Sequence, residues 1–244
     1  MKESNMLLLN KYFDMPNYNS IYKELAGQTV NWLSGDSLKL YNKNLINRYD
    51  DLKKHNWLDN HFTYTFNSLG FRSNEFTQDP TIMFLGCSYT MGLGLPVDFI
   101  WPELVSKNLK MNCANLGISG GSCDTAFRLC HGYIDRIKPK VVVLMIPPGV
   151  RCENVNDKDV HNILIGNVKY EYYFKTLSVD ENNNYFNREK NILGIKMLCT
   201  ERNIKLVVVD CDELNCADSL ARDLSHCGIE SHNIFYKKIL EQIQ

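Results

Sequence analysis

Three residues that could together perform acyl transfer stand far apart in this sequence. Ser88 follows a short apolar run, Thr81 to Leu85, whereas Asp223 and His226 stand near the C-terminus. A serine hydroxyl is unreactive by itself and needs a base, which must in turn be oriented. Asp223 stands three residues before His226, so in a turn it could accept a proton from His226 Nδ1 and leave Nε2 free to take the proton of Ser88. We therefore predict a nucleophilic serine site.

The residues around Ser88 and His226 resemble two motifs of the SGNH or GDSL-type hydrolases. The family's first block, Gly-Asp-Ser, is matched by Gly86-Cys87-Ser88, and its last block, Asp-x-x-His, is matched by Asp223 to His226. The segment from Asn115 to Gly120 is similar to the second block. The resemblance runs from about residue 62 to the end of the chain, and its first and last motifs together are specific.

This resemblance implies a three-layer α/β/α fold with a flavodoxin-like parallel sheet, and a serine esterase. We expect no cofactor, and no metal because the cysteines lack the paired short spacing of a zinc site. Ser88, Asp223 and His226 would be the catalytic residues. The backbone N–H groups of Ser88 and Gly120 would form the oxyanion hole. The implied substrate is an acetylated carbohydrate or another short acyl ester.

The chain departs from the family pattern after the third expected strand. The family has an asparagine there that donates to the oxyanion, and this chain has Ile146-Pro147-Pro148-Gly149-Val150-Arg151 instead. Either the two backbone N–H groups suffice, or another donor such as Arg151 substitutes. Arg151 and Tyr89 are candidates for contact with the substrate or the oxyanion. Cys87 also replaces the usual aspartate beside the serine.

The elements that must position these residues follow an alternating pattern. Short apolar runs predict buried strands, and the segments between them have the apolar spacing of helices. Strands that alternate with helices imply a parallel sheet whose strand-to-helix loops all emerge at one edge. Ser88, Gly120, Arg151 and the Asp223–His226 pair lie on such loops. The expected strands are 81–85, 112–116, 141–146 and 204–209, and the expected helices are 99–110, 122–137, 187–202 and 230–244.

Residues 1–78 are expected to form an extension that packs on an α/β hydrolase domain of residues 79–244. Helices are plausible at 20–33 and 37–54, and a strand at 61–66 runs into a turn that ends at Arg72, for which a structural role is favoured over substrate contact. The extension contains a literal Gly35-Asp36-Ser37-Leu38. We reject Ser37 as the nucleophile because no apolar strand precedes it, and expect Asp36 or Ser37 to cap a helix.

An insertion between the third strand and the next helix is polar and aromatic. Residues 168–174 in it suggest a hairpin, and such an insertion could form a lid or a plain surface loop, of which the loop is favoured.

Composition excludes several function classes. Lysine plus arginine minus aspartate plus glutamate is 27 − 28 = −1, which gives no electrostatic case for nucleic acid or an anionic membrane. No apolar run approaches the roughly 20 residues that span a bilayer. We expect no signal peptide, because the apolar run at 6–9 is short and polar residues follow it. The nine cysteines are scattered without a Cys-x-x-Cys pair, so we expect reduced thiols and a cytoplasmic protein.

Two other interpretations stay open. The chain could be a catalytically silent SGNH-fold module that binds carbohydrate or protein, which the altered third block permits. A nucleotide-binding flavodoxin-like protein is the second alternative, because the turn at 117–121 is rich in glycine. Among the remaining histidines, His232 is the nearest rival base, and we expect the others to be structural or exposed: His55, His61, His131 and His161.

Overall fold

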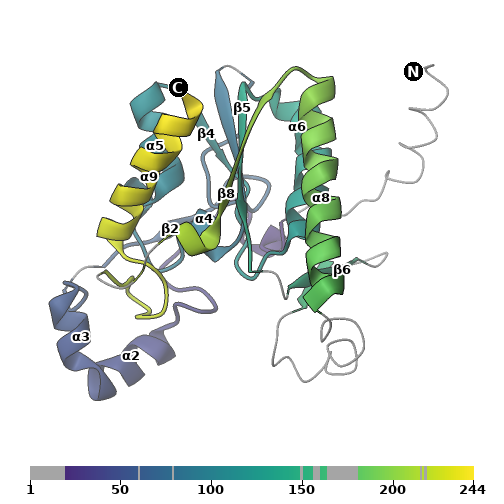
Figure 1. Ribbon diagram of the computed structural model, residues 1–244. Helices are drawn as coiled ribbons and strands as arrows, with labels where there is room; N and C mark the ends of the chain where they lie inside the picture. The colour runs from purple at the N-terminus through teal and green to yellow at the C-terminus, as the bar shows by residue number, and fades with distance from the viewer. Residues whose placement is uncertain are drawn as a thin grey trace.

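The computed structural model describes residues 20–59, 61–78, 80–148, 151–155, 160–163, 181–214, 216 and 219–244. Their centre is a four-stranded parallel sheet with the strand order β4-β3-β5-β8 (Figure 1). The two middle strands are buried along their whole length, as their apolar sequences predict. The strands are β3 (Thr81–Leu85), β4 (Asn112–Asn115), β5 (Val141–Ile146) and β8 (Lys205–Asp210).

Two pairs of helices cover the two faces of this sheet. Helices α6 (Cys123–Ile137) and α8 (Glu181–Glu201) pack together on one face, and α5 (Trp101–Leu109) and α9 (Ile229–Ile243) pack together on the other (Figure 1). Because successive side chains of a strand point to opposite faces, Met83 joins the first core and Phe84 the second. The three-layer α/β/α fold is therefore confirmed, with the expected alternation of strands and helices.

Local capping explains where the sheet-covering helices begin and end. The Ser122 side chain accepts a hydrogen bond from Thr125 N, and Thr125 returns one to the Ser122 backbone, which is a capping box at the start of α6. Lys110 and Lys138 adopt the left-handed conformation at the ends of α5 and α6. Helix α8 begins at Glu181, earlier than the apolar spacing predicted.

The expected helix at 20–33 is wrong. The structure has a short 3₁₀ helix, η1 (Lys23–Leu25), followed by β1 (Thr29–Val30), which pairs antiparallel with β2 (Tyr64–Thr65). Gly27 lies between η1 and β1 with a φ of 70° and redirects the chain. The expected strand at 61–66 is thus reduced to β2.

The next expected helix, at 37–54, is divided in two. Helix α2 (Leu38–Asn47) and helix α3 (Tyr49–Lys54) are separated by Arg48, whose φ and ψ of −141° and 36° are not helical. Ser37 accepts a hydrogen bond from Leu40 N at 3.2 Å. Ser37 is therefore the N-cap, as expected for this part of the literal Gly-Asp-Ser-Leu.

Five short elements complete the described residues: α4 (Ser88–Met91), η2 (Val97–Phe99), η5 (Cys211–Glu213) and the antiparallel pair of β6 (Cys152–Val155) with β7 (Val160–Ile163). The hairpin suggested at 168–174 lies outside the described residues. Across the described parts of the chain, none of the helices has the length and apolar character needed to cross a membrane.

Candidate active site

Ser88 lies at the carboxyl end of β3, where the sheet opens into loops. Gly86 turns the chain with a φ of 156°, and a Cβ atom there would come within 2.2 Å of Thr90 Oγ1. Only glycine fits this close approach, which delivers Ser88 as the first residue of α4. The Ser88 residue is 3% exposed.

The Asp223–His226 segment is a tight turn that brings its carboxylate and imidazole together. Ala221 N donates to His226 O at 2.8 Å, and Leu224 adopts a positive φ of 55°. Asp223 Oδ1 accepts hydrogen bonds from the backbone N–H groups of Ser225 and His226, both at 3.1 Å. The other oxygen, Oδ2, lies 2.5 Å from His226 Nδ1. The backbone therefore fixes the carboxylate that orients the imidazole.

The structure brings Ser88 to this pair across 138 residues of sequence. His226 Nε2 lies 2.9 Å from Ser88 Oγ. When Nδ1–H donates to Asp223, the neutral imidazole presents an unprotonated Nε2 that can accept the hydroxyl proton. The three side chains thus form one hydrogen-bonded chain in the order that proton abstraction from a serine requires.

Two loops at the same edge of the sheet each carry a backbone N–H group that is a candidate donor to an oxyanion. Among the described residues, the N–H groups of Ser88 and Gly120 have no hydrogen-bond partner. The loop that carries Gly120 is tied to the turn before Ser88, since Ile118 N donates to Gly86 O at 3.1 Å. Asn115 adds a second tie by donating to Thr90 O at 2.9 Å. Sequence analysis did not single out Asn115 for this role.

Tyr89 lies beside the His226 imidazole, and the charge of Arg151 affects the pKa of Tyr89. The Tyr89 and His226 ring centroids are 5.4 Å apart. Burial raises the pKa of Tyr89, nearby Cys87 raises it further, and the positive charge of Arg151 opposes both. Arg151 Nη1 is buried and has no hydrogen-bond partner within the described part of the chain. Arg151 thus has an unused donor on the loop that follows β5.

His232 is not placed as a base for Ser88. It is buried in α9, and its Nδ1 accepts a hydrogen bond from Trp101 N at 3.0 Å. Burial, with help from the charges of His226 and Arg72, lowers the pKa of His232 to about 3. A neutral His232 therefore satisfies the first turn of α5.

The expectation that all nine cysteines are reduced is wrong for two of them. Cys216 and Cys227 form a disulfide, and the Cα atoms are 4.4 Å apart. Cys227 lies next to His226, in the turn closed by the Leu220–Cys227 bridge. Because the chain reverses direction at this bridge, the two cysteines come together although 11 residues separate them in sequence.

Among the described residues, one cluster has the composition of a metal site. Ligand atoms of Asp210, Cys211 and Asp212 lie within 4.8 Å of one another. Asp210 also caps η5 by accepting from Asp212 N, and it pairs with Arg188 at 3.7 Å. These contacts account for the cluster without a metal ion.

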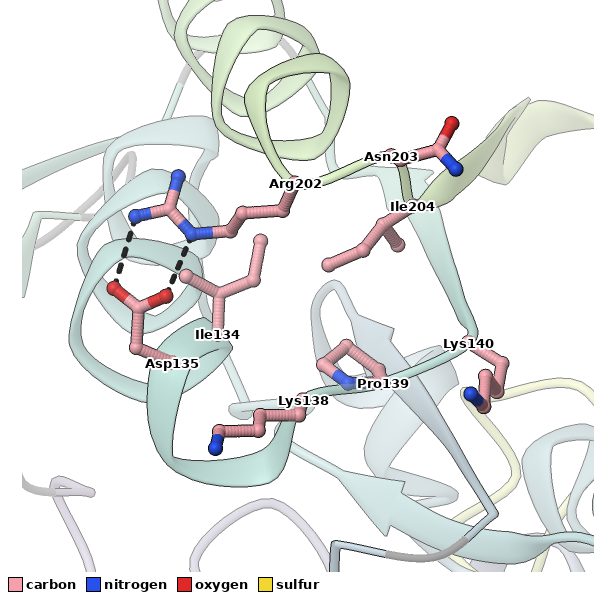
Figure 2. A pocket seen from close by; sticks show the side chains of 8 residues that line it. All are labelled: Ile134, Asp135, Lys138, Pro139, Lys140, Arg202, Asn203 and Ile204. Atoms are coloured by element: carbon pink, nitrogen blue, oxygen red, sulfur yellow. Dashed lines mark hydrogen bonds and ion pairs between the residues drawn. The ribbon is translucent and has the colours of Figure 1, made fainter.

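A cavity of about 500 Å³ lies away from Ser88 (Figure 2). It is formed where the chain enters β5 and β8, which is the edge of the sheet opposite to Ser88. Figure 2 shows Arg202 paired with Asp135 on one wall. The cavity contains none of the expected site residues.

No protein-family model and no curated protein sequence matches this chain. Among the solved structures that do match is a family two carbohydrate esterase from Clostridium thermocellum, at 14% identity and a TM-score of 0.39, over 70% of this chain and 65% of that one. The esterase EstA from Pseudoalteromonas sp. matches at 13% and 0.38, over 68% and 97%. AlinE4, an SGNH-hydrolase family esterase, matches at 14% and 0.37, over 69% and 74%. These matches include an esterase of the family that the sequence motifs resemble. Because the sequence identities and TM-scores are low, the support for an activity comes from the site.

Proposed function

We propose that this protein is a serine esterase that uses Ser88, His226 and Asp223. The observation that carries the proposal is the continuous hydrogen-bonded chain from Ser88 Oγ through both imidazole nitrogens to Asp223 Oδ2, with distances of 2.9 and 2.5 Å. A serine and a histidine without a catalytic role would rarely be joined to a buried carboxylate that two backbone N–H groups hold in place. Asp223 is 2% exposed and has that support.

The reaction proceeds in two acyl transfers. His226 Nε2 takes the proton of Ser88 Oγ as the oxygen attacks the ester carbonyl. The tetrahedral intermediate collapses, His226 gives that proton to the leaving alcohol, and the acyl group stays on Ser88. Water then attacks the acyl-enzyme as His226 takes its proton, and His226 returns that proton to Ser88 Oγ as the bond to the acyl carbon breaks and the acid product leaves. Asp223 stabilises the imidazolium in both halves.

The free N–H groups of Ser88 and Gly120 are the proposed oxyanion donors. Losing one donor of an oxyanion hole costs about 3 to 4 kcal/mol in the transition state. The third donor that the SGNH motif would supply is an asparagine, and this chain lacks it at the expected position. Arg151, with its unpartnered Nη1 on the loop after β5, is the proposed replacement or a substrate contact, together with Tyr89. The proposed substrate class is a short acyl ester or an acetylated carbohydrate.

Hydrolysis of p-nitrophenyl acetate and butyrate, measured beside labelling with a fluorophosphonate probe, tests this proposal. We expect the wild type to turn over an ester and to be labelled at Ser88, and Ser88→Ala to lose both. The matched control is Ser37→Ala, which removes the serine of the literal Gly-Asp-Ser-Leu and should keep both. An unlabelled, inactive wild type would support a binding module instead.

A further inference from the structure

A buried ion pair links the extension to the turn that carries the proposed triad. Arg222 Nη2 lies 2.7 Å from Asp36 Oδ2, and both side chains are 1% exposed. Arg222 immediately precedes Asp223. The guanidinium lies over the rings of Trp32 and Phe62, at 4.0 and 3.9 Å from their centroids. The pair therefore anchors the backbone next to Asp223 in a buried setting.

Tyr64 and Gly94 close this pair into a ring of four residues. Tyr64 OH donates to Asp36 and accepts from Gly94 N at 2.8 Å, and Gly94 O accepts from Arg222 N at 3.0 Å. Burial and the negative charge of Asp36 raise the pKa of Tyr64, so its hydroxyl stays protonated. The ring joins three separate segments: the extension, the loop after Ser88 and the turn before His226.

Gly94 shows how closely these segments approach one another. Its φ is 80°, and a Cβ atom there would lie 2.8 Å from Ala221 Cβ and 3.2 Å from Asp223 Oδ1. Arg72 holds the same loop by donating to the carbonyl oxygens of Gly92 and Leu95, both at 2.5 Å. The loop after Ser88 is therefore packed against the carboxylate that orients His226.

Other residues of the extension hold the same turn by its carbonyl oxygens. Trp57 Nε1 donates to Leu220 O at 2.8 Å, and Arg48 Nη1 donates to Leu224 O at 3.0 Å. Asn44 Nδ2 donates to Asp223 O at 3.3 Å. The turn is thus held from both sides of Asp223 by residues distant in sequence.

We infer that Asp36 and Tyr64 are positioning residues of the site: through Arg222 and Gly94 they fix the distance between Ser88 and the Asp223–His226 pair. The inference rests on the proposed function. A buried ion pair gains little stability, because desolvation opposes the attraction, and apolar residues of similar volume often serve as well. Positioning of the site explains the ion pair better than stability does, because a displacement of about 1 Å can lower the rate about 100-fold.

The sharpest test compares Tyr64→Phe with Tyr41→Phe. Both variants remove one buried hydroxyl of the extension that makes two hydrogen bonds. Within the described part of the chain, the partners of Tyr41 OH are Trp57 O and Leu58 O. We expect similar falls in Tm, a loss of about 10-fold in kcat with KM unchanged for Tyr64→Phe alone, and unchanged kcat for Tyr41→Phe. Equal kcat in the two variants would overturn the inference.

A second variant separates the effect of the ion pair on the geometry of the site from its effect on the stability of the fold. Asp36→Leu combined with Arg222→Met replaces the pair by apolar side chains, so Tm should fall only through the lost hydrogen bonds from Tyr64 OH to Asp36 and from Arg222 Nη2 to Asn31 O. We expect kcat to fall by about 100-fold all the same. A stable double variant with wild-type kcat would refute a positioning role.

A measurement that needs no turnover keeps this inference separate from the proposed function. We expect the His226 Nδ1 proton that faces Asp223 to give a downfield NMR signal in protein labelled with ¹⁵N-histidine. We expect the signal to shift or broaden in Tyr64→Phe and to be unchanged in Tyr41→Phe. If the wild type neither hydrolyses esters nor reacts with the probe, the esterase proposal fails, and this signal alone decides the positioning role: no difference between the variants rejects it.

Discussion

At the scale of single residues, Asp223 divides its two oxygens between two tasks. Oδ1 accepts from two backbone N–H groups and Oδ2 from the imidazole, so the carboxylate has no freedom to rotate. An amide in its place can accept at only one atom. It would either lose the backbone contacts or turn its NH₂ toward Nδ1.

We therefore expect Asp223→Asn to lower kcat by about 10³ to 10⁴-fold with little change in KM, because an amide NH₂ that donates to Nδ1 leaves the imidazole proton on Nε2, where it blocks transfer from Ser88. Steady-state kinetics with p-nitrophenyl acetate measure this. Asp212→Asn, which changes an exposed carboxylate elsewhere, serves as the control. A loss below 10-fold in Asp223→Asn would contradict the assigned role.

His232 makes the stability of the fold depend on pH. Its folded pKa of about 3 lies below its ordinary value of 6.5, so between these values the unfolded chain takes up a proton that the folded chain does not. Stability should therefore fall as the pH drops from 6.5 toward 3, by about 1.4 kcal/mol for each pH unit within that range. His232→Asn keeps an acceptor for Trp101 N and cannot be protonated. Urea unfolding at several pH values should show a shallower acid slope for it, and exposed His61→Asn should retain the wild-type slope.

Ser88, Asp223 and His226 were predictable from sequence because each lies in a local pattern: a serine after a buried strand, and a carboxylate three residues before a histidine. The structure brings them together as the topology required. The Asp36–Arg222 pair spans 186 residues and has no local pattern, so sequence could not predict it. Asp36 was considered only as a helix cap, and its side chain points to Arg222 and Tyr64 instead.

At the scale of elements, the parallel sheet followed from apolar runs of the right length, and its strands begin and end close to the expected residues. The extension was harder to predict because its elements are short and polar. The segment 20–33 had helical spacing but contains Gly27, and β1 gains its hydrogen bonds from β2, more than 30 residues further along the chain. A partner so distant overrides local preference.

The disulfide constrains the turn that ends at Cys227. A closed loop of this size is expected to stabilise the fold by about 2 to 3 kcal/mol, mainly by restricting the unfolded chain. Cys216→Ala should therefore lower Tm, and dithiothreitol should lower the Tm of the wild type to the same level. Cys152→Ala, at a half-buried free thiol, is the control and should respond to the reductant as the wild type does. A wild type that is insensitive to reductant would show that the thiols are free.

At the scale of the whole molecule, the extension and the sheet share buried contacts and should unfold as one unit. Trp32 and Trp57 report on the extension, and Trp101 lies in the core beside β3. We expect Trp101→Phe and the double variant Trp32→Phe/Trp57→Phe each to show fluorescence transitions that coincide with the loss of helical circular dichroism. Different midpoints for the fluorescence and circular dichroism transitions would mean that the extension unfolds while the sheet stays folded. The hydrogen-bonded ring around Asp36 would then hold the two parts together only weakly.

The strand order also leaves two edges of the sheet open among the described strands, at β4 and at β8. Among the described strands, β8 has a hydrogen-bonded neighbour only at β5, and its Val208 is 37% exposed. An edge strand with unpaired backbone N–H and C=O groups and an exposed apolar side chain can pair with a strand of another molecule. Concentrated stocks and refolding mixtures should accordingly form β-rich aggregates that nucleate at Lys205–Asp210, and dilution during refolding is the practical safeguard.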